Sequence, residues 1–285
     1  MRPHTWPVAR WLLALPAIVC ATSGRGQGAE DTAPAARVQL RVETAVFDGT
    51  DEDEEPVARS LTLFQDGVVW DFLEPVAATP MPIVAEEIVL HDPARGRVVV
   101  IDPTRRVRTE ISAARLSRVR TSLHVWAQGS DDALLQWSAS PECTPHVPPD
   151  GGQLELDGPG ARYRVATSPA PSAAAAEQYR SFADAAVILR ALLHPGGLPP
   201  FPRLAINREL AAAGLLPDTV SLELSGGSLR QSRVLRSEHR CAPRLTDADL
   251  DRIETASAAM AVADVLDLDE YMQRDAAVAA ANAAR

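Results

Sequence analysis

The histidines and cysteines, which could bind a metal, lack the spacing that metal sites need. The six histidines are His4, His91, His124, His146, His194 and His239. No two of them form a His-x-His or His-Glu-x-x-His pair, so no metal site is predicted. His239 lies two residues before Cys241, an arrangement that would bind a metal only with further ligands brought in by the fold. We expect neither a metal nor another cofactor.

Acidic residues could still carry out acid/base hydrolysis, because the two carboxylates of a glycosidase need no local motif. The candidates are Asp71, Glu86, Glu87 and Asp184. The chain contains no lysine, since its 28 basic residues are all arginines. Chemistry that depends on a P-loop lysine, a Schiff base or a Ser-Lys pair is therefore excluded, and no Gly-x-Ser-x-Gly elbow is present. We assign no catalytic residue and keep a carboxylate-dependent hydrolase as the third functional hypothesis.

Residues 1–29 have the composition of a signal peptide followed by a flexible leader. Arg2 and Arg10 precede the apolar run Trp11–Ala21, which is as long as a signal core and too short to span a bilayer. We expect cleavage after this run or near the end of the leader, and no transmembrane span in the mature chain. The protein is thus predicted to be extracytoplasmic, either periplasmic or secreted. A lipoprotein anchored at Cys20 is the less favoured alternative, because valine precedes the cysteine where a small residue is usual.

Charge and cysteine content narrow the range of partners. The net charge of −10 becomes about −13 without residues 1–29, which hold three arginines and no acid, so we expect no nucleic-acid partner. Two cysteines remain, Cys143 and Cys241. In an oxidising compartment two such thiols usually pair, so we predict a disulfide between them, with two unpaired thiols as the alternative. The sequence does not indicate an oligomeric state.

The stretch from Phe64 to Ile111 predicts an antiparallel meander. Apolar runs at Val68–Leu73, Ile88–His91 and Val98–Ile101 are separated by turn sequences, among them Asp66-Gly67. Asp-Gly suits a two-residue hairpin turn, in which both residues have positive φ. Further strands are expected at 37–46, 60–65, 106–111, 134–138, 153–156, 161–166, 219–224 and 229–240.

Apolar residues at helical spacing predict helices at 112–126, 172–194, 202–213, 247–263 and 267–284. Thr246 and Asp249 form an Asp variant of the capping box at the start of one of them. Strands and helices do not alternate, so a parallel α/β sheet is not expected. We predict one α+β domain over residues 30–285, with a helical C-terminal segment, 246–285. Its curved, half-barrel-like antiparallel sheet should have about 9–11 strands, covered on one face by the helices.

The meander also carries a resemblance. The sequences DGVVWDF and EEIVLHDPARGRVVVIDPTRRVRTEI, with the later run that begins YRSFADAAVILRALLHPGG, resemble a family of uncharacterised secreted bacterial proteins of planctomycete-like composition. More distantly, the meander is similar to strands of the periplasmic lipoprotein carriers LolA and LolB. That resemblance implies a curved sheet whose concave, helix-covered face takes acyl chains. This chain departs from that pattern by lacking a strong helix before its first strand and by having extra helices at its end, so no ligand residue is carried over.

The leading functional hypothesis is a non-enzymatic binding protein for a lipid or lipoprotein acyl chain on the concave face. Its alternative is a structural or interaction protein of the cell envelope with a filled interior. The candidate apolar lining is Trp70, Phe72, Trp126, Trp137, Tyr179 and Phe201. The candidate contacts for an anionic group are Arg115, Arg118 and Arg120, within a segment, 95–120, that has eight arginines and two acids. These arginines could instead pair with segment 247–275, which has nine acids and two arginines.

Overall fold

The computed structural model describes residues 38–49, 55–74, 87–142, 152–225 and 232–273. The strands are β1 (Leu40–Asp48), β2 (Ala58–Gln65), β3 (Val68–Glu74), β4 (Glu87–Asp92), β5 (Arg97–Asp102), β6 (Val107–Ser112), β7 (Gly152–Gly158), β8 (Ala161–Pro169), β9 (Leu215–Leu224), β10 (Arg233–Ala242) and β11 (Asp264–Leu266). The helices are α1 (Ala113–Gln128), α2 (Ala133–Ala139), α3 (Ala173–Leu193), α4 (Phe201–Ala212) and α5 (Asp247–Val262), with a 3-10 turn η1 (Pro93–Arg95).

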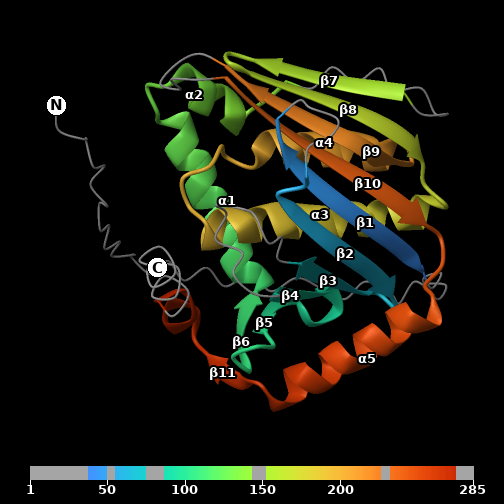
Figure 1. The fold of residues 1–285 in the computed structure, drawn as a ribbon. Coiled ribbons are helices and arrows are strands. Elements are labelled where there is room, and N and C mark those ends of the chain that lie inside the picture. The colour runs from blue at the N-terminus through green and yellow to red at the C-terminus, as the bar shows by residue number, and fades with distance from the viewer. Residues whose placement is uncertain (1–37, 50–54, 75–86, 143–151, 226–231, 274–285) are drawn as a thin grey trace, which may run out of the picture. The chain divides into compact units, whose positions relative to one another are not determined.

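All eleven strands form one sheet, in the order β11-β6-β5-β4-β3-β2-β1-β10-β9-β8-β7 (Figure 1). Two antiparallel meanders, β1 to β6 and β7 to β10, join where β1 pairs with β10. The pair formed by β11 and β6 is parallel. The predicted α+β fold with a curved, mainly antiparallel sheet is therefore confirmed.

Local turn chemistry accounts for the hairpins of the first meander. Asp66 and Gly67 both have positive φ, 50° and 82°, as the predicted two-residue turn requires. The β4–β5 connection is the turn η1, where the Asp92 carboxylate accepts a hydrogen bond from the backbone N–H of Arg95. Arg106 before β6 also has a positive φ, 54°, which the sequence analysis did not anticipate.

The helices cover both faces of the sheet, and the expectation that all of them lie on one face is wrong. We call the face beneath α3 the inner face, on which Leu73, Val89 and Val100 cluster with Leu189 of α3. The opposite, outer face of strands β2 to β5 is covered by α5, whose Ile253 belongs to a second cluster. Figure 1 shows α3 and α5 on opposite sides of these strands. The reason is visible in β3, whose five central residues are all buried, so both of its faces need a cover.

One other expectation is corrected and two are confirmed. Residues 134–138 are not a strand but belong to α2, whose first turn is capped by the Asp132 carboxylate. The strand expected at 229–240 is described from Arg233 to Ala242. The capping box of Thr246 with Asp249 is present as predicted, and Ser112 and Ser172 cap α1 and α3. No helix in the described part of the chain is long and apolar enough to cross a bilayer.

Candidate functional site

The six aromatic residues expected to line one cavity are divided among separate parts of the fold. Trp70 and Phe72 lie in the outer cluster beneath α5, where the guanidinium carbon of Arg252 is 4.5 Å from the Phe72 ring centroid. Tyr179 lies on the inner face, stacked on Phe64 with ring centroids 6.2 Å apart. Trp70 and Phe72 are two residues apart on β3, so both point to the outer face, whereas Tyr179 belongs to α3, which covers the inner face.

The other three aromatics lie on helices α1, α2 and α4. Trp126 near the end of α1 is 55% exposed and is not part of the core. Trp137 of α2 partly covers the β7–β8 hairpin, where a Cβ atom added to Gly158 would lie 2.3 Å from its ring. Phe201 at the start of α4 meets His124 edge-on, with ring centroids 5.2 Å apart. The structure thus brings no common pocket together from these six residues.

The three arginines expected to contact an anion lie on α1. Arg118 and Arg120 are exposed. Arg115 Nη2 lies 3.6 Å from Asp269 Oδ1, so the C-terminal segment contacts the basic helix at this point. Strand β11 adds a second contact of that segment, with the edge strand β6. Cys143 and the signal region lie outside the described residues, so the disulfide and the signal peptide stay predictions.

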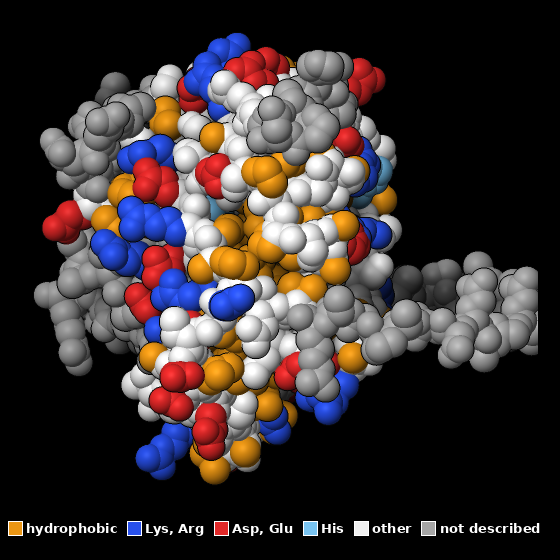
Figure 2. All heavy atoms as spheres, turned by 90° about the vertical axis from the view of Figure 1, so that its right-hand side faces the viewer, with side chains coloured by type: hydrophobic (Ala, Val, Ile, Leu, Met, Phe, Trp, Pro, Cys, Tyr) orange, Lys and Arg blue, Asp and Glu red, His pale blue; other side chains and the backbone are white. Residues whose placement is uncertain are grey.

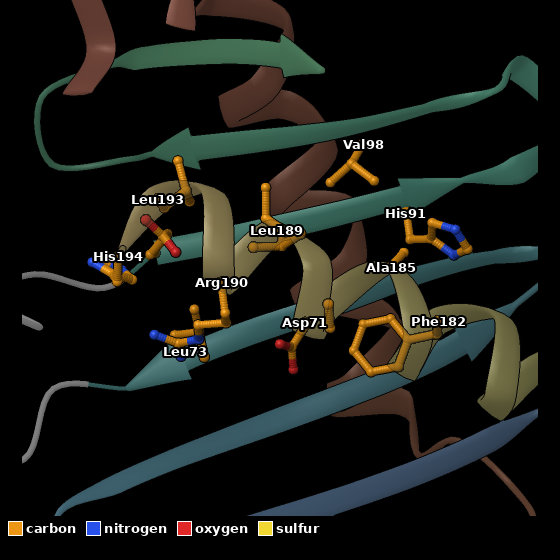
Figure 3. Close-up of a pocket in the computed structure, with 13 residues that line it drawn as sticks. Asp71, Leu73, His91, Val98, Phe182, Ala185, Leu189, Arg190, Leu193 and His194 are labelled. Carbon is orange, nitrogen blue, oxygen red and sulfur yellow. The ribbon is translucent and has the colours of Figure 1, made fainter. Parts of the chain in front are cut away.

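A small pocket lies between α3 and the inner face of β3, β4 and β5 (Figure 3). It is lined by Asp71, Leu73, Glu87, Val89, His91, Val98, Phe182, Ala185, Ala186, Leu189, Arg190, Leu193 and His194. Most of these side chains are apolar, and the polar ones come from β3, β4 and the C-terminal end of α3. At that end of α3, the lining residue His194 is exposed.

Strand register places the polar groups of the pocket. Asp71 pairs with Val89 across the β3–β4 ladder, and His91 pairs with Val69 on β3 and with Val98 on β5. Asp71 and His91 therefore lie on the same face of the sheet, diagonal to each other, beneath α3. From the sequence, Asp71 was expected only as a candidate acid, His91 was considered only as a metal ligand, and Arg190 was not expected at a site. The spacing of His91 could have revealed it, because His91 follows Val89 by two residues and both side chains therefore point to the inner face of β4.

Asp71 is a buried carboxyl group with few partners. Thr62 on the neighbouring strand β2 donates a hydrogen bond to it, with 2.7 Å between Oγ1 and Oδ1. Burial raises the pKa of Asp71 above its ordinary value, because the anion is poorly solvated beneath α3. The Thr62 hydrogen bond and the positive charge of Arg190 oppose this rise only in part. Asp71 is thus held toward its protonated form, in which it can donate a hydrogen bond.

His91 is the second buried polar group of the pocket. It is 9% exposed, and among the described residues its Nδ1 has no hydrogen-bond partner. Burial lowers the pKa of His91, although the neighbouring Asp92 carboxylate acts in the opposite direction. The imidazole is therefore neutral at neutral pH, with a buried nitrogen left to receive or donate one hydrogen bond.

The pocket is too small for a lipid tail in this conformation. Its volume is about 30 Å3, and one water molecule needs at least about 10–15 Å3. It therefore has room for about two water-sized groups. Around it, Leu192 and Leu193 of α3, Leu204 of α4 and Met272 pack only partly buried against the inner cluster.

The candidate acids that the structure describes lie in two separate places. Asp71 and Glu87 both line the pocket. Asp184 belongs to a different contact, between α3 and α4, where Asn207 Nδ2 donates to Asp184 Oδ1 over 2.9 Å. Arg180 also binds the Asp184 carboxylate, with 3.0 Å between Nη1 and Oδ2. Glu86 lies outside the described residues, and those that are described contain no group of three potential metal ligands.

Comparison with known proteins gives a weak likeness in fold. No family model matches the sequence, and no curated protein matches it. Among solved structures, the chain is similar to a LolA superfamily protein from Nitrosomonas europaea, with 9% sequence identity and a TM-score of 0.28. The match covers 75% of this chain and 90% of that one. A TM-score this low supports no argument about function, so the chain is assigned to no family.

Proposed function

We propose that the protein is a non-enzymatic, extracytoplasmic binding protein for a single-chain amphiphile, such as a lipid with one acyl chain. The observation that carries this proposal is the pocket between α3 and the inner face of β3 to β5. Its walls are largely aliphatic, it contains a few polar groups, and its lining residue His194, just after α3, is exposed. Ligand sites commonly combine an apolar lining with a small number of placed polar groups.

The volume of the pocket limits how an amphiphile is held. About 30 Å3 accommodates only the first few atoms of the ligand. The remaining chain must therefore lie outward, along the partly buried Leu192, Leu193 and Leu204, or enter as α3 moves away from the sheet. A whole lipoprotein acyl group is held here only if α3 moves.

A second candidate function rests on the filled interior. Both faces of β2 to β5 are packed by helices, and the residual pocket is small. A structural or interaction protein of the cell envelope needs a solid core of this kind and no ligand. The two proposals differ in whether a small molecule accompanies the purified protein.

Native mass spectrometry of protein purified from its own envelope fraction separates them. We expect a mass adduct that organic extraction removes, and we expect Ala185→Leu to abolish it by filling the pocket that Ala185 lines. Ala174→Leu is the matched control, because Ala174 lies on the exposed surface of the same helix. An adduct-free wild type that also fails to bind added dodecyl amphiphiles would refute ligand binding and leave the structural function.

A further inference from the structure

We propose that a second copy of this chain docks on the outward face of helix α1, with its own helix α5 as the contacting element. The proposal is independent of ligand binding, because no residue that lines the pocket belongs to α1 or α5. It rests on the exposed apolar side chains of α1 and on the opposite charges that the two helices present to solvent.

The outward face of α1 exposes two large apolar side chains next to each other. Val125 is 63% exposed and Trp126 is 55% exposed, and they are two of the five large hydrophobic residues that are exposed in the described chain. Tryptophan and arginine are the residues that most often dominate the energy of protein–protein contacts. The C-terminal end of α1 therefore offers an apolar centre for a contact.

The positive charge of α1 is only partly neutralised within the part of the chain that the structure describes. The helix contains three arginines and no acid. Arg115 reaches Asp269, but neither Arg118 nor Arg120 forms an ion pair with a described residue. Arg118 is exposed and precedes Val125 by seven residues, or about two helical turns, so the two share one face. This face thus combines a positive charge with apolar surface.

Helix α5 presents the complementary face. Exposed residues at spacings of three and four form one side of it, namely Asp247, Leu250, Asp251 and Glu254. None of these three acids forms an ion pair with a described residue. Ile253 packs against the sheet and so turns this side of the helix to solvent. Figure 2 shows acidic side chains close together at the lower end of the molecule, the height at which α5 runs in Figure 1.

The two faces lie apart within one molecule, so a second copy is needed to bring them together. Leu116 of α1 belongs to the inner cluster and Ile253 of α5 to the outer cluster, on opposite faces of the sheet. Between two copies, Arg118 can meet the acids of α5 while Val125 and Trp126 cover the partly exposed side chain at its centre. The charges then select the partner and its orientation, whereas the buried apolar surface supplies most of the affinity.

Analytical ultracentrifugation tests this self-association. We expect the mean mass of the wild type to rise with protein concentration at low salt and to fall toward the monomer as ionic strength increases. Arg118→Glu and Asp251→Arg should each weaken association by about tenfold or more. An equimolar mixture of the two variants should restore it, because the unaltered α1 of one variant then meets the unaltered α5 of the other.

Arg208→Glu is the matched control, since it makes the same charge change at an exposed arginine of α4 and should associate as the wild type does. Circular dichroism establishes that each variant is folded. A wild type that stays monomeric would overturn the proposal, and so would association that Asp251→Arg leaves unchanged. Binding of the wild type to anionic vesicles that Arg118→Glu abolishes would assign α1 to a membrane and overturn it as well. None of these outcomes affects the amphiphile-binding function.

Discussion

Replacement of Ile253 by alanine measures how strongly α5 is bound to the outer face of the sheet. Ile253 is 8% exposed and packs in the cluster that contains Trp70 and Phe72. The change removes three carbon atoms, worth about 2 kcal/mol at about 0.8 kcal/mol for each buried methylene. The cavity left beneath α5 raises the expected loss of unfolding free energy to about 3 kcal/mol.

Urea unfolding followed by far-ultraviolet circular dichroism gives this loss as a lower midpoint at an unchanged slope. Val262→Ala on the same helix is the control, because Val262 is 72% exposed and its truncation should change the free energy by no more than about 0.5 kcal/mol. Equal stabilities of the two variants would refute the packing of α5 on the outer face. A fall in the slope for Ile253→Ala alone would show that α5 detaches before the sheet unfolds.

Four further predictions concern single positions. Gly67→Ala should lower the free energy of unfolding by about 1 kcal/mol, because alanine is strained at φ +82° even though its Cβ would meet no atom within 4 Å. An unchanged urea midpoint would refute this prediction. The Asp71→Asn variant should be more stable than the wild type above about pH 4 and equally stable below it. The reason is that the pKa of Asp71 is raised in the folded state, so its ionisation opposes folding as the pH rises. Melting curves that show the reverse trend with pH would contradict this prediction. Cys143 and Cys241 should form a disulfide, which non-reducing peptide mapping detects and a titration of two free thiols would exclude. Arg115→Gln should increase proteolysis of the C-terminal segment, because it removes the contact of Arg115 with Asp269. The wild-type protein should not bind anionic vesicles, and binding to them would show that the basic helix faces a membrane.

Local chemistry could be predicted from the sequence, whereas contacts between distant segments could not. Asp66-Gly67 and the capping box of Thr246 with Asp249 were found because their hydrogen bonds and dihedral angles involve only nearby residues. The helix at 133–139 was mistaken for a strand, because a short apolar run does not distinguish the two. Strand β11 was missed because three residues at a sheet edge leave no periodic pattern.

The candidate site was harder to predict than the fold. Aromatic side chains were chosen by residue type, but the pocket is lined mainly by aliphatic residues and closed by α3. Its polar groups come from β3, β4 and α3, so only the strand register and the position of the helix bring them together. The sequence also did not predict which face of the sheet α5 covers, because the apolar stripe of a helix packs equally well on either face.

The position of β1 in the middle of the sheet has a consequence for the order of folding. Thr44 of β1 contacts His239 of β10 across 195 residues of sequence, so this ladder closes a very long loop. Contacts of high sequence separation form slowly, because the entropy of loop closure must be overcome before they contribute. Until β10 arrives, β1 is the open edge of a six-stranded meander and can pair with another chain. The newly made protein therefore depends on being kept from self-association until its last third has been synthesised.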